Sequence, residues 1–346
     1  TICNGATTNA VIFTGSVSGT IFNWTNNNTS IGLAAGGNGN IPAFTAINTT
    51  NAPVTATITV TPSTGGSGGF AYITGSGAGI PGGGGVSVIN IATNTVVATI
   101  PTGLQPFFAS VSPDGSRVYT SNFSSNTVSA INTATNTVVA TIPAGTGPSG
   151  AAGITVSPDG SRVYVCNYLD NTVSVINTST NTVVTTIPVG YNPHCIAVSP
   201  NGNLVYVSNS GSFYTGNISV INTSTNTVVT TIDFGLFNPT PEGSAFSPDG
   251  SLLYVSIYGH DMVFVINTST SVIVATIPVG YRPYGLSISP DGSRVYVTHP
   301  ILSNVSVINT STNTLVATIT GVGGANGLYG LSVTSDGSRV YVPNLS

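Results

Sequence analysis

Short runs in which apolar and polar residues alternate recur along most of the chain, separated by turns rich in Gly, Asn, Asp, Ser and Thr. Alternation with a period of two is typical of β-strands that bury one face. No segment has the period of an amphipathic helix, so the chain is predicted to be all-β. Within residues 283–320 the pattern predicts four strands, at Gly285–Ile288, Arg294–Thr298, Val305–Ile308 and Thr314–Ile319.

This four-strand pattern is repeated along the chain. The phrase Ser-Pro-Asp-Gly-Ser-Arg-Val-Tyr, or a weaker copy of it, returns every 42 to 48 residues and ends at Tyr119, Tyr164, Tyr206, Tyr254, Tyr296 and Tyr341. A second phrase, Ile-Asn-Thr-x-Thr, follows the first five copies, and an earlier copy with Ile91 in place of the first Thr starts at Ile89. Pro-Asp-Gly predicts the turn between strands A and B, and Asn-Thr-Ser-Thr-Asn predicts the turn between strands C and D. Four short strands in a repeat of this length are typical of β-propeller blades.

The Val-Tyr-Val strand, the Ser-Pro-Asp-Gly turn and the Ile-Asn-Thr strand resemble the YVTN-type β-propeller family over residues 70–346. The resemblance implies seven blades and an extracellular or cell-surface setting. The repeat predicts seven copies of strand B, the first marked by Tyr72, but six copies each of strands C and D. We therefore expect a seven-bladed propeller whose last blade is incomplete, with closure as six blades as the alternative.

Residues 1–62 lack the repeat and predict a small antiparallel β-sandwich. Its strands are expected at Ala10–Thr14, Thr20–Trp24, Ala43–Asn48 and Val54–Val60, with Trp24 as the core anchor. The stretches 2–9 and 22–27 resemble PKD-like modules of secreted surface proteins of Bacteroidota. A Gly/Ser linker is predicted at 63–69 and the propeller at 70–346. Because Ile58–Pro62 also resembles a propeller strand A, residues 56–62 could serve either domain.

Charge is scarce: the 346 residues are 40% hydrophobic and 4% charged, with net charge −4 and no lysine. Nucleic-acid binding is excluded because it needs clustered basic residues. No apolar run is long enough to predict a membrane span. The three cysteines, Cys3, Cys166 and Cys195, have no metal-binding or redox spacing, so they could be thiols or include one disulfide. No cofactor and no metal are expected.

The repeat also predicts which face carries function. The A–B and C–D turns are monotonous, whereas the B–C and D–A loops on the opposite face vary and carry most aromatic and unpaired charged residues. The residue after the proline that precedes strand A should point to the mouth of the central channel. This position, with Tyr329 as an equivalent without the proline and Arg282 nearby, gives the ligand-binding candidates Phe107, Ser149, His194, Glu242, Arg282, Tyr284 and Tyr329.

His194 and Glu242 occupy equivalent positions in adjacent blades, so they could approach each other as a general base or part of a metal site. The alternative is a solvated rim histidine and a separate rim carboxylate. The other histidines, His260 and His299, are predicted in outer B–C loops. Because no Ser–His–Asp order, P-loop or nucleotide fingerprint is present, the expectation is that the protein is not an enzyme.

The leading functional hypothesis is an extracellular surface protein that binds a glycan or a protein partner at the B–C and D–A loop face. The low charge and the modular build suggest a second hypothesis, a self-assembling subunit of a surface layer, sheath or filament. A third is a lactonase-like hydrolase that uses His194 and Glu242.

Overall fold

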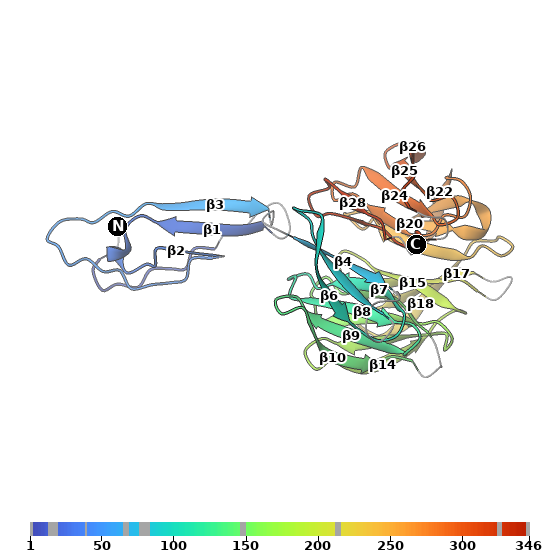
Figure 1. Ribbon diagram of the computed structural model, residues 1–346, viewed down its shortest axis with the longest axis horizontal. Coiled ribbons are helices and arrows are strands. Elements are labelled where there is room, and N and C mark those ends of the chain that lie inside the picture. The colour runs from blue at the N-terminus through green and yellow to red at the C-terminus, as the bar shows by residue number, and fades with distance from the viewer. Residues whose placement is uncertain are drawn as a thin grey trace. The chain divides into compact units, whose positions relative to one another are not determined.

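The computed structural model describes residues 3–12, 20–38, 40–64, 69–75, 84–145, 150–211, 216–323 and 327–343. The chain divides into two compact units, one of Thr1–Phe70 with Asn90–Asn94 and the other of Ala71–Ile89 with Thr95–Ser346. In the described residues the only helices are two 3-10 turns, η1 (Thr29–Ile31) and η2 (Tyr258–His260) (Figure 1). No helix there is long and apolar enough to cross a membrane. The all-β prediction is confirmed.

The first unit contains a three-stranded antiparallel sheet in the order β2-β1-β3, built from β1 (Thr20–Asn26), β2 (Gly36–Asn38) and β3 (Ile58–Thr64). Trp24 is 5% exposed and packs with Leu33 and Ile41 in the core of this unit. β3 pairs with β1 along its whole length. Residues 58–62 are therefore part of this sheet and not a propeller strand A.

Two of the strands predicted for this unit differ in the structure. Residues 43–48 are not a strand but make an isolated bridge, between Thr45 and Thr7. The reason is local: the Phe44 amide donates to the Thr8 hydroxyl at 3.0 Å, so a side chain replaces a backbone partner of the ladder. The strand predicted at Ala10–Thr14 falls partly outside the described residues, as do the predicted linker residues 65–68.

The described residues of the second unit form seven antiparallel sheets, five of them four-stranded, and the chain is a seven-bladed propeller. Strands A of adjacent blades contact one another. These inner strands are β7 (Pro106–Val111), β11 (Ala151–Val156), β15 (Pro193–Val198), β19 (Pro241–Phe246), β23 (Leu286–Ile288) and β27 (Ser332–Val333). Strands B are β4 (Phe70–Gly75), β8 (Arg117–Asn122), β12 (Arg162–Asn167), β16 (Leu204–Asn209), β20 (Leu252–Ile257), β24 (Arg294–His299) and β28 (Val340–Tyr341).

Strands C and D lie further out in each sheet. Strands C are β5 (Gly85–Asn90), β9 (Thr127–Asn132), β13 (Thr172–Asn177), β17 (Asn217–Asn222), β21 (Met262–Asn267) and β25 (Asn304–Asn309). Strands D are β6 (Thr95–Pro101), β10 (Thr137–Pro143), β14 (Thr182–Pro188), β18 (Thr227–Asp233), β22 (Val272–Pro278) and β26 (Thr314–Thr320). The predicted counts of strands B, C and D match those of the described residues.

Aspartate closes each Pro-Asp-Gly turn. In the second blade, Asp114 Oδ1 accepts hydrogen bonds from the Ser112 hydroxyl at 2.6 Å and the Ser116 amide at 3.0 Å. Gly115 follows with a φ of 71°, which a residue with a side chain rarely adopts. These bonds favour the charged carboxylate and lower the pKa of Asp114 to about 2. Most of the few carboxylates of the chain are thus turn residues on the face opposite the variable loops.

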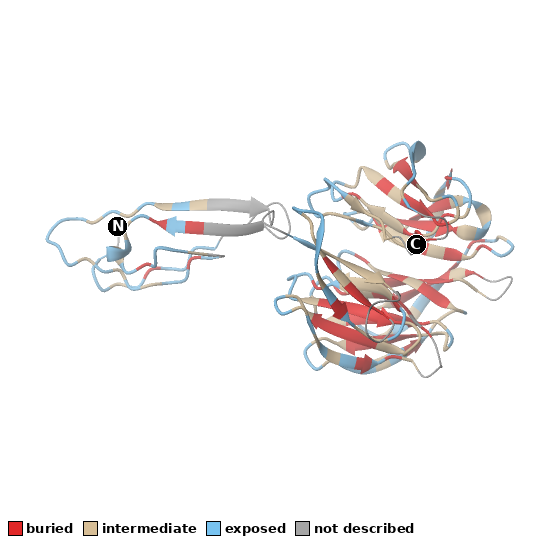
Figure 2. Cartoon of the chain, viewed as in Figure 1, coloured by how far each residue is buried: buried red, intermediate tan, exposed pale blue. Residues whose placement is uncertain are grey.

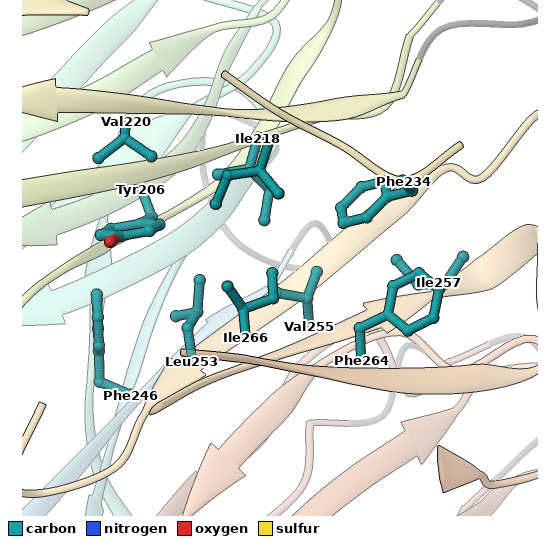
Figure 3. Packing of buried hydrophobic residues seen from close by; sticks show 11 residues of the cluster. Tyr206, Ile218, Val220, Phe234, Phe246, Leu253, Val255, Ile257, Phe264 and Ile266 are labelled. Carbon is teal, nitrogen blue, oxygen red and sulfur yellow. The ribbon is translucent and has the colours of Figure 1, made fainter. Parts of the chain in front are cut away.

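Buried side chains from neighbouring blades form the core, and Figure 2 shows that burial is concentrated in strands B and C. Between the fourth and fifth blades, Tyr206 of β16 packs edge-on against Phe246 of β19, with ring centroids 5.2 Å apart (Figure 3). Ile232 of β18 joins the same cluster. Burial of each such side chain contributes about 1.5–3 kcal/mol. The sheets are therefore held to one another by apolar contacts.

In four blades strand B ends in a polar residue that contacts a serine of strand C. In three blades it is an asparagine: Asn122, Asn167 and Asn209 each donate to such a serine hydroxyl at 2.8–2.9 Å. In the sixth blade it is His299, which is 1% exposed and has Nε2 2.8 Å from the Ser306 hydroxyl. The prediction that His299 lies in an outer loop is wrong, because this hydrogen bond holds the residue within β24.

Burial lowers the pKa of His299 below its ordinary value of 6.5. As the pH falls below 6.5, the unfolded chain therefore takes up a proton at this residue before the folded chain does, and stability decreases. We expect the free energy of unfolding to fall more between pH 7.5 and 5 in the wild type than in His299→Asn, which introduces the residue found at this position in the second, third and fourth blades. Denaturant unfolding at both pH values measures this difference. Equal losses in the two proteins would assign the effect to other groups.

Candidate functional site

The innermost strands of the propeller surround a cavity of about 740 Å³. Strands β7, β15, β19 and β27, the segment leading into β23, and β4 of the first blade all contribute to its wall. The side chains of its wall include Phe107, Phe108, Tyr168, His194, Cys195, Glu242, Tyr284 and Tyr329. Residues at or just before strand A of five blades thus reach a common space, whereas no described residue of β11 (Ala151–Val156) lines it.

Five of the seven candidate residues line this cavity: Phe107, His194, Glu242, Tyr284 and Tyr329. Ser149 lies outside the described residues. Arg282 is not part of the cavity wall. Its guanidinium lies 5.0 Å from the ring centre of Tyr258 and 5.1 Å from that of Tyr281, and its Nη1 donates to the Tyr258 hydroxyl at 3.1 Å. The guanidinium therefore packs against these two tyrosine rings outside the cavity wall.

A β-bulge at the start of strand A aims these side chains. The pairing of β15 with β16 shifts register between Pro193 and Cys195, and that of β19 with β20 shifts between Pro241 and Ser244. A bulge breaks strict alternation and can turn consecutive residues to one side. As a result Cys195 lines the cavity together with His194, and Phe108 together with Phe107. Sequence reasoning missed Phe108 and Cys195 because alternation places them on the other face.

His194 joins two partners from the next two blades. Its Nδ1 lies 2.8 Å from Glu242 Oε2, and its Nε2 lies 3.0 Å from the Tyr284 hydroxyl. The side chains of His194 and Glu242 are only 10% and 12% exposed. The approach of these two residues, expected from their equivalent positions, is therefore present. A Glu–His–Tyr array of this kind can move a proton between a carboxylate-supported imidazole and a bound molecule.

The contact between His194 and Glu242 is short but not aligned as a hydrogen bond. In the described structure, neither Nδ1 of His194 nor Oε2 of Glu242 has a hydrogen-bond partner of good geometry. The 2.8 Å separation nevertheless places the imidazole nitrogen and the carboxylate oxygen in direct contact. Buried polar atoms without partners are uncommon in folded proteins and call for an explanation, which a bound ligand or water can supply.

Four aromatic rings surround the imidazole of His194 edge to face. Phe107 and Tyr284 have ring centroids 5.5 Å from it, Tyr168 6.0 Å and Phe108 6.1 Å, all with interplanar angles of 80–84°. Such T-shaped contacts are favoured by the charge distribution of aromatic rings. They fix the orientation of the imidazole and exclude water from its faces. The His194 imidazole is thus packed among aromatic rings.

Burial also determines which groups of the cavity can ionise. Burial raises the pKa of Tyr284 well above its ordinary value, and the Glu242 carboxylate raises it further; the pKa of Tyr168 is raised for the same two reasons. Both phenols therefore stay protonated and can donate hydrogen bonds. Burial raises the pKa of the Cys195 thiol, so it is a poor nucleophile. No Arg or Lys belongs to the described wall.

Metal and disulfide chemistry find no support among the described residues. No group of three or more His, Cys, Asp and Glu there is close enough to hold a metal ion. All three cysteines are free thiols, and the Cys166 thiol donates to the Cys195 carbonyl oxygen at 3.8 Å. His260 lies outside the cavity, with its Nε2 2.7 Å from the Phe237 carbonyl oxygen. The chemistry of the site therefore rests on His194, Glu242 and Tyr284.

A comparison with protein families matches part of this propeller. Residues 113–231 match a family described as lactonase, 7-bladed beta-propeller. The matched segment includes His194 but neither Glu242 nor Tyr284, and it covers less than half of the chain. No curated protein matches the sequence.

Solved structures resemble the chain in fold. Hydrazine synthase of Kuenenia stuttgartiensis superposes with a TM-score of 0.68 and 21% sequence identity, over 75% of this chain and 86% of that chain. Because one propeller fold supports many activities, this likeness supports the architecture alone.

The lactonase match contradicts the expectation that the protein is not an enzyme. That expectation rested on the missing linear motifs and on the small number of ionisable residues near the channel. Single residues from successive blades nevertheless form a compact ionisable array at the channel mouth. An array assembled from separate blades leaves no local motif in the sequence.

Proposed function

We propose that the protein hydrolyses an uncharged lactone or ester in the cavity, with His194 as the general base. The observation that carries the proposal is the position of the His194 ring, which lies between the Glu242 carboxylate at 2.8 Å and the Tyr284 hydroxyl at 3.0 Å. The match of residues 113–231 to a lactonase family agrees with this chemistry. The protonated, partly buried Tyr284 phenol supplies a hydrogen-bond donor next to the base.

The reaction needs only water as co-reactant. When Nδ1 of His194 carries the proton and faces Glu242, Nε2 is able to accept a proton. A water molecule that takes the place of the Tyr284 hydroxyl at Nε2 leaves that hydroxyl free to donate a hydrogen bond to the substrate carbonyl. The water oxygen then bonds to the carbonyl carbon while its proton passes to Nε2. Tyr284 stabilises the resulting oxyanion and Glu242 the imidazolium. When the ring C–O bond breaks, His194 returns the proton to the alkoxide, giving a hydroxy acid.

The wall of the cavity favours an uncharged substrate. No cationic side chain in the described wall can neutralise a phosphate or carboxylate, whereas Glu242 would repel one. The rings of Phe107, Tyr284 and Tyr329 offer surfaces for a ring-shaped molecule. The same rings suit a neutral saccharide, so we propose glycan binding at this cavity as a second function.

A panel of substrates tests the proposal. Wild-type protein is incubated with neutral γ- and δ-lactones, p-nitrophenyl acetate and a phosphorylated sugar lactone, and acid release is followed in a pH-stat, with a neutral oligosaccharide as competitor. We expect the neutral compounds to be hydrolysed at least about tenfold faster than the phosphorylated one, because a phosphate would lose hydration without gaining a partner. Failure to hydrolyse any compound would contradict the hydrolase proposal. Preference for the phosphorylated lactone would contradict the substrate class.

A further inference from the structure

The side chains of the cavity wall are sorted by chemistry around the ring of blades. The second blade supplies three phenylalanines, which we call the phenylalanine cluster: Phe107 and Phe108 of β7, and Phe123 after β8. The polar partners of His194 are Glu242 of the fifth blade and Tyr284 of the sixth. Because strands A from the second to the sixth blade contact one another in order, His194 of the fourth blade lies between the two groups along this arc.

The rings of the phenylalanine cluster contact one another and are only half-buried. The ring centroid of Phe107 lies 4.9 Å from that of Phe108 and 5.9 Å from that of Phe123. All three residues line the cavity and are of intermediate exposure. Since apolar surface is unfavourable in water, a ligand that covers these rings gains binding free energy in proportion to the apolar area it buries.

The phenylalanine cluster begins beside the proposed base. The ring centroids of Phe107 and Phe108 lie 5.5 and 6.1 Å from that of the His194 imidazole. Phe123 extends this apolar surface through its contacts with Phe107 and, at 6.1 Å, with Tyr168. A lactone whose carbonyl faces His194 and Tyr284 would therefore bring a substituent on its ring over the phenylalanine cluster.

The size of the cavity leaves space for such a substituent. Its volume of about 740 Å³ lies within the range of about 300–1,000 Å³ that is typical of pockets for drug-sized ligands. An unsubstituted lactone ring of five or six atoms is much smaller than a ligand of that size. Such a ring would reach the polar groups around His194 and leave the phenylalanine cluster uncovered.

We infer that the substrate is a lactone that carries an apolar substituent, an alkyl group of several carbons, and that Phe107, Phe108 and Phe123 bind this substituent. The inference rests on the proposed function, because it assigns the second part of the same substrate. The three phenylalanines are specificity-determining residues. They act on the binding of the substituent, whereas His194, Glu242 and Tyr284 act on the ring that is opened.

Binding of cyclic ketones, which cannot be hydrolysed, tests the inference without turnover. The full chain is titrated with cyclopentanone, 2-propylcyclopentanone and 2-pentylcyclopentanone in an isothermal titration calorimeter. We expect the affinity to rise about twofold to fourfold for each added CH₂, because each group leaves water for an apolar surface. An affinity that does not depend on the length of the alkyl group, or no binding of any ketone, would overturn the inference.

Hydrolysis of the matching lactones separates this inference from the proposed function. γ-Butyrolactone is compared in the pH-stat with γ-nonalactone, which has the same ring and a pentyl group. We expect kcat/KM to be at least about tenfold higher for γ-nonalactone. Equal values for the two lactones would overturn the apolar subsite and leave the hydrolase. Acid release from neither lactone, with ketone binding that depends on the alkyl group, would overturn the hydrolase and support the subsite.

Two protein variants locate the subsite. Phe123→Ala is expected to weaken binding of 2-pentylcyclopentanone at least about fivefold and that of cyclopentanone less than about twofold, because only the alkyl group loses a contact surface. Phe237→Ala is the matched control: Phe237 is 70% exposed and does not belong to the described cavity wall. It should bind both ketones as the wild type does.

Circular dichroism checks the fold of both variants. Equal weakening of both ketones in Phe123→Ala, or equal affinities in Phe123→Ala and Phe237→Ala, would contradict the assigned surface. If Phe123→Ala does not fold, the ketone series with the wild type decides the inference, since that series needs no variant.

Discussion

Replacing His194 with glutamine is expected to lower kcat/KM for lactone hydrolysis by about 10²- to 10⁴-fold, the usual contribution of a positioned general base. Glutamine keeps a polar group of similar length but cannot accept a proton from water. Because His194 contacts both Glu242 and Tyr284, its replacement also separates the carboxylate from the phenol. Initial rates over a range of lactone concentrations measure the loss, which should fall mainly on kcat.

The matched control for this variant is His260→Gln. His260 is a partly exposed histidine that contacts the Phe237 carbonyl and does not line the cavity. It should retain wild-type kinetics. Glu242→Gln should lower kcat in the same direction as His194→Gln, since the amide cannot stabilise an imidazolium. Wild-type rates in His194→Gln would remove the assigned base, whereas a loss in His260→Gln as large as in His194→Gln would point to a general effect on folding.

Gly243→Ala is expected to destabilise the propeller and to impair the site together. A Cβ at this position would lie 2.3 Å from the Tyr284 carbonyl oxygen and 2.9 Å from the Leu286 amide nitrogen. Backbone atoms cannot turn aside as a side chain can, so the fifth and sixth blades would have to separate. The Gly243 amide also donates to the Tyr284 carbonyl at 3.0 Å, a bond that would be lengthened. Overpacking of this kind costs about 1–3 kcal/mol.

Denaturant unfolding measures the loss of stability. The hydrolysis assay measures the loss of activity that is expected when Glu242 is displaced relative to Tyr284. Gly75→Ala is the control, because no described heavy atom lies within 4 Å of the position where its Cβ would be. It should change the free energy of unfolding little. If Gly243→Ala is as stable and as active as Gly75→Ala, the close approach of the two blades does not constrain the site.

The fold was largely predictable because each blade repeats similar turn and strand sequences. Ser-Pro-Asp-Gly closes a turn with bonds that Asp114 makes to residues two positions away, so the turn can be read from the sequence. Features that depend on another part of the chain were less accessible. His299 lies at the end of a buried strand because it takes the place of an asparagine and reaches Ser306.

The candidate site was predictable in part. Equivalent repeat positions place His194 and Glu242 in neighbouring strands, and that correctly brings them together. The presence of Phe108 and Cys195 in the cavity wall could not be predicted, because a β-bulge changes the direction of side chains without a signature in the residue types. The position of Arg282 was also hidden, since its stacking on Tyr258 depends on the shape of a loop. The expectation that the protein is not an enzyme is contradicted by the match of residues 113–231 to a lactonase family, which no linear catalytic motif in the chain indicates.

The bulged position at the start of strand A supplies side chains to the cavity wall, whereas the rest of the strand forms part of the blade. Phe107, His194 and Glu242 occupy this bulged position in three blades, and Tyr284 holds the equivalent position before β23. These positions can therefore accept other side chains, at little expected cost to the stability of the blade cores. A small combinatorial library restricted to these positions would sample many constellations of acid, base and ring at fixed spacing, so the same propeller could be turned to other reactions without being redesigned.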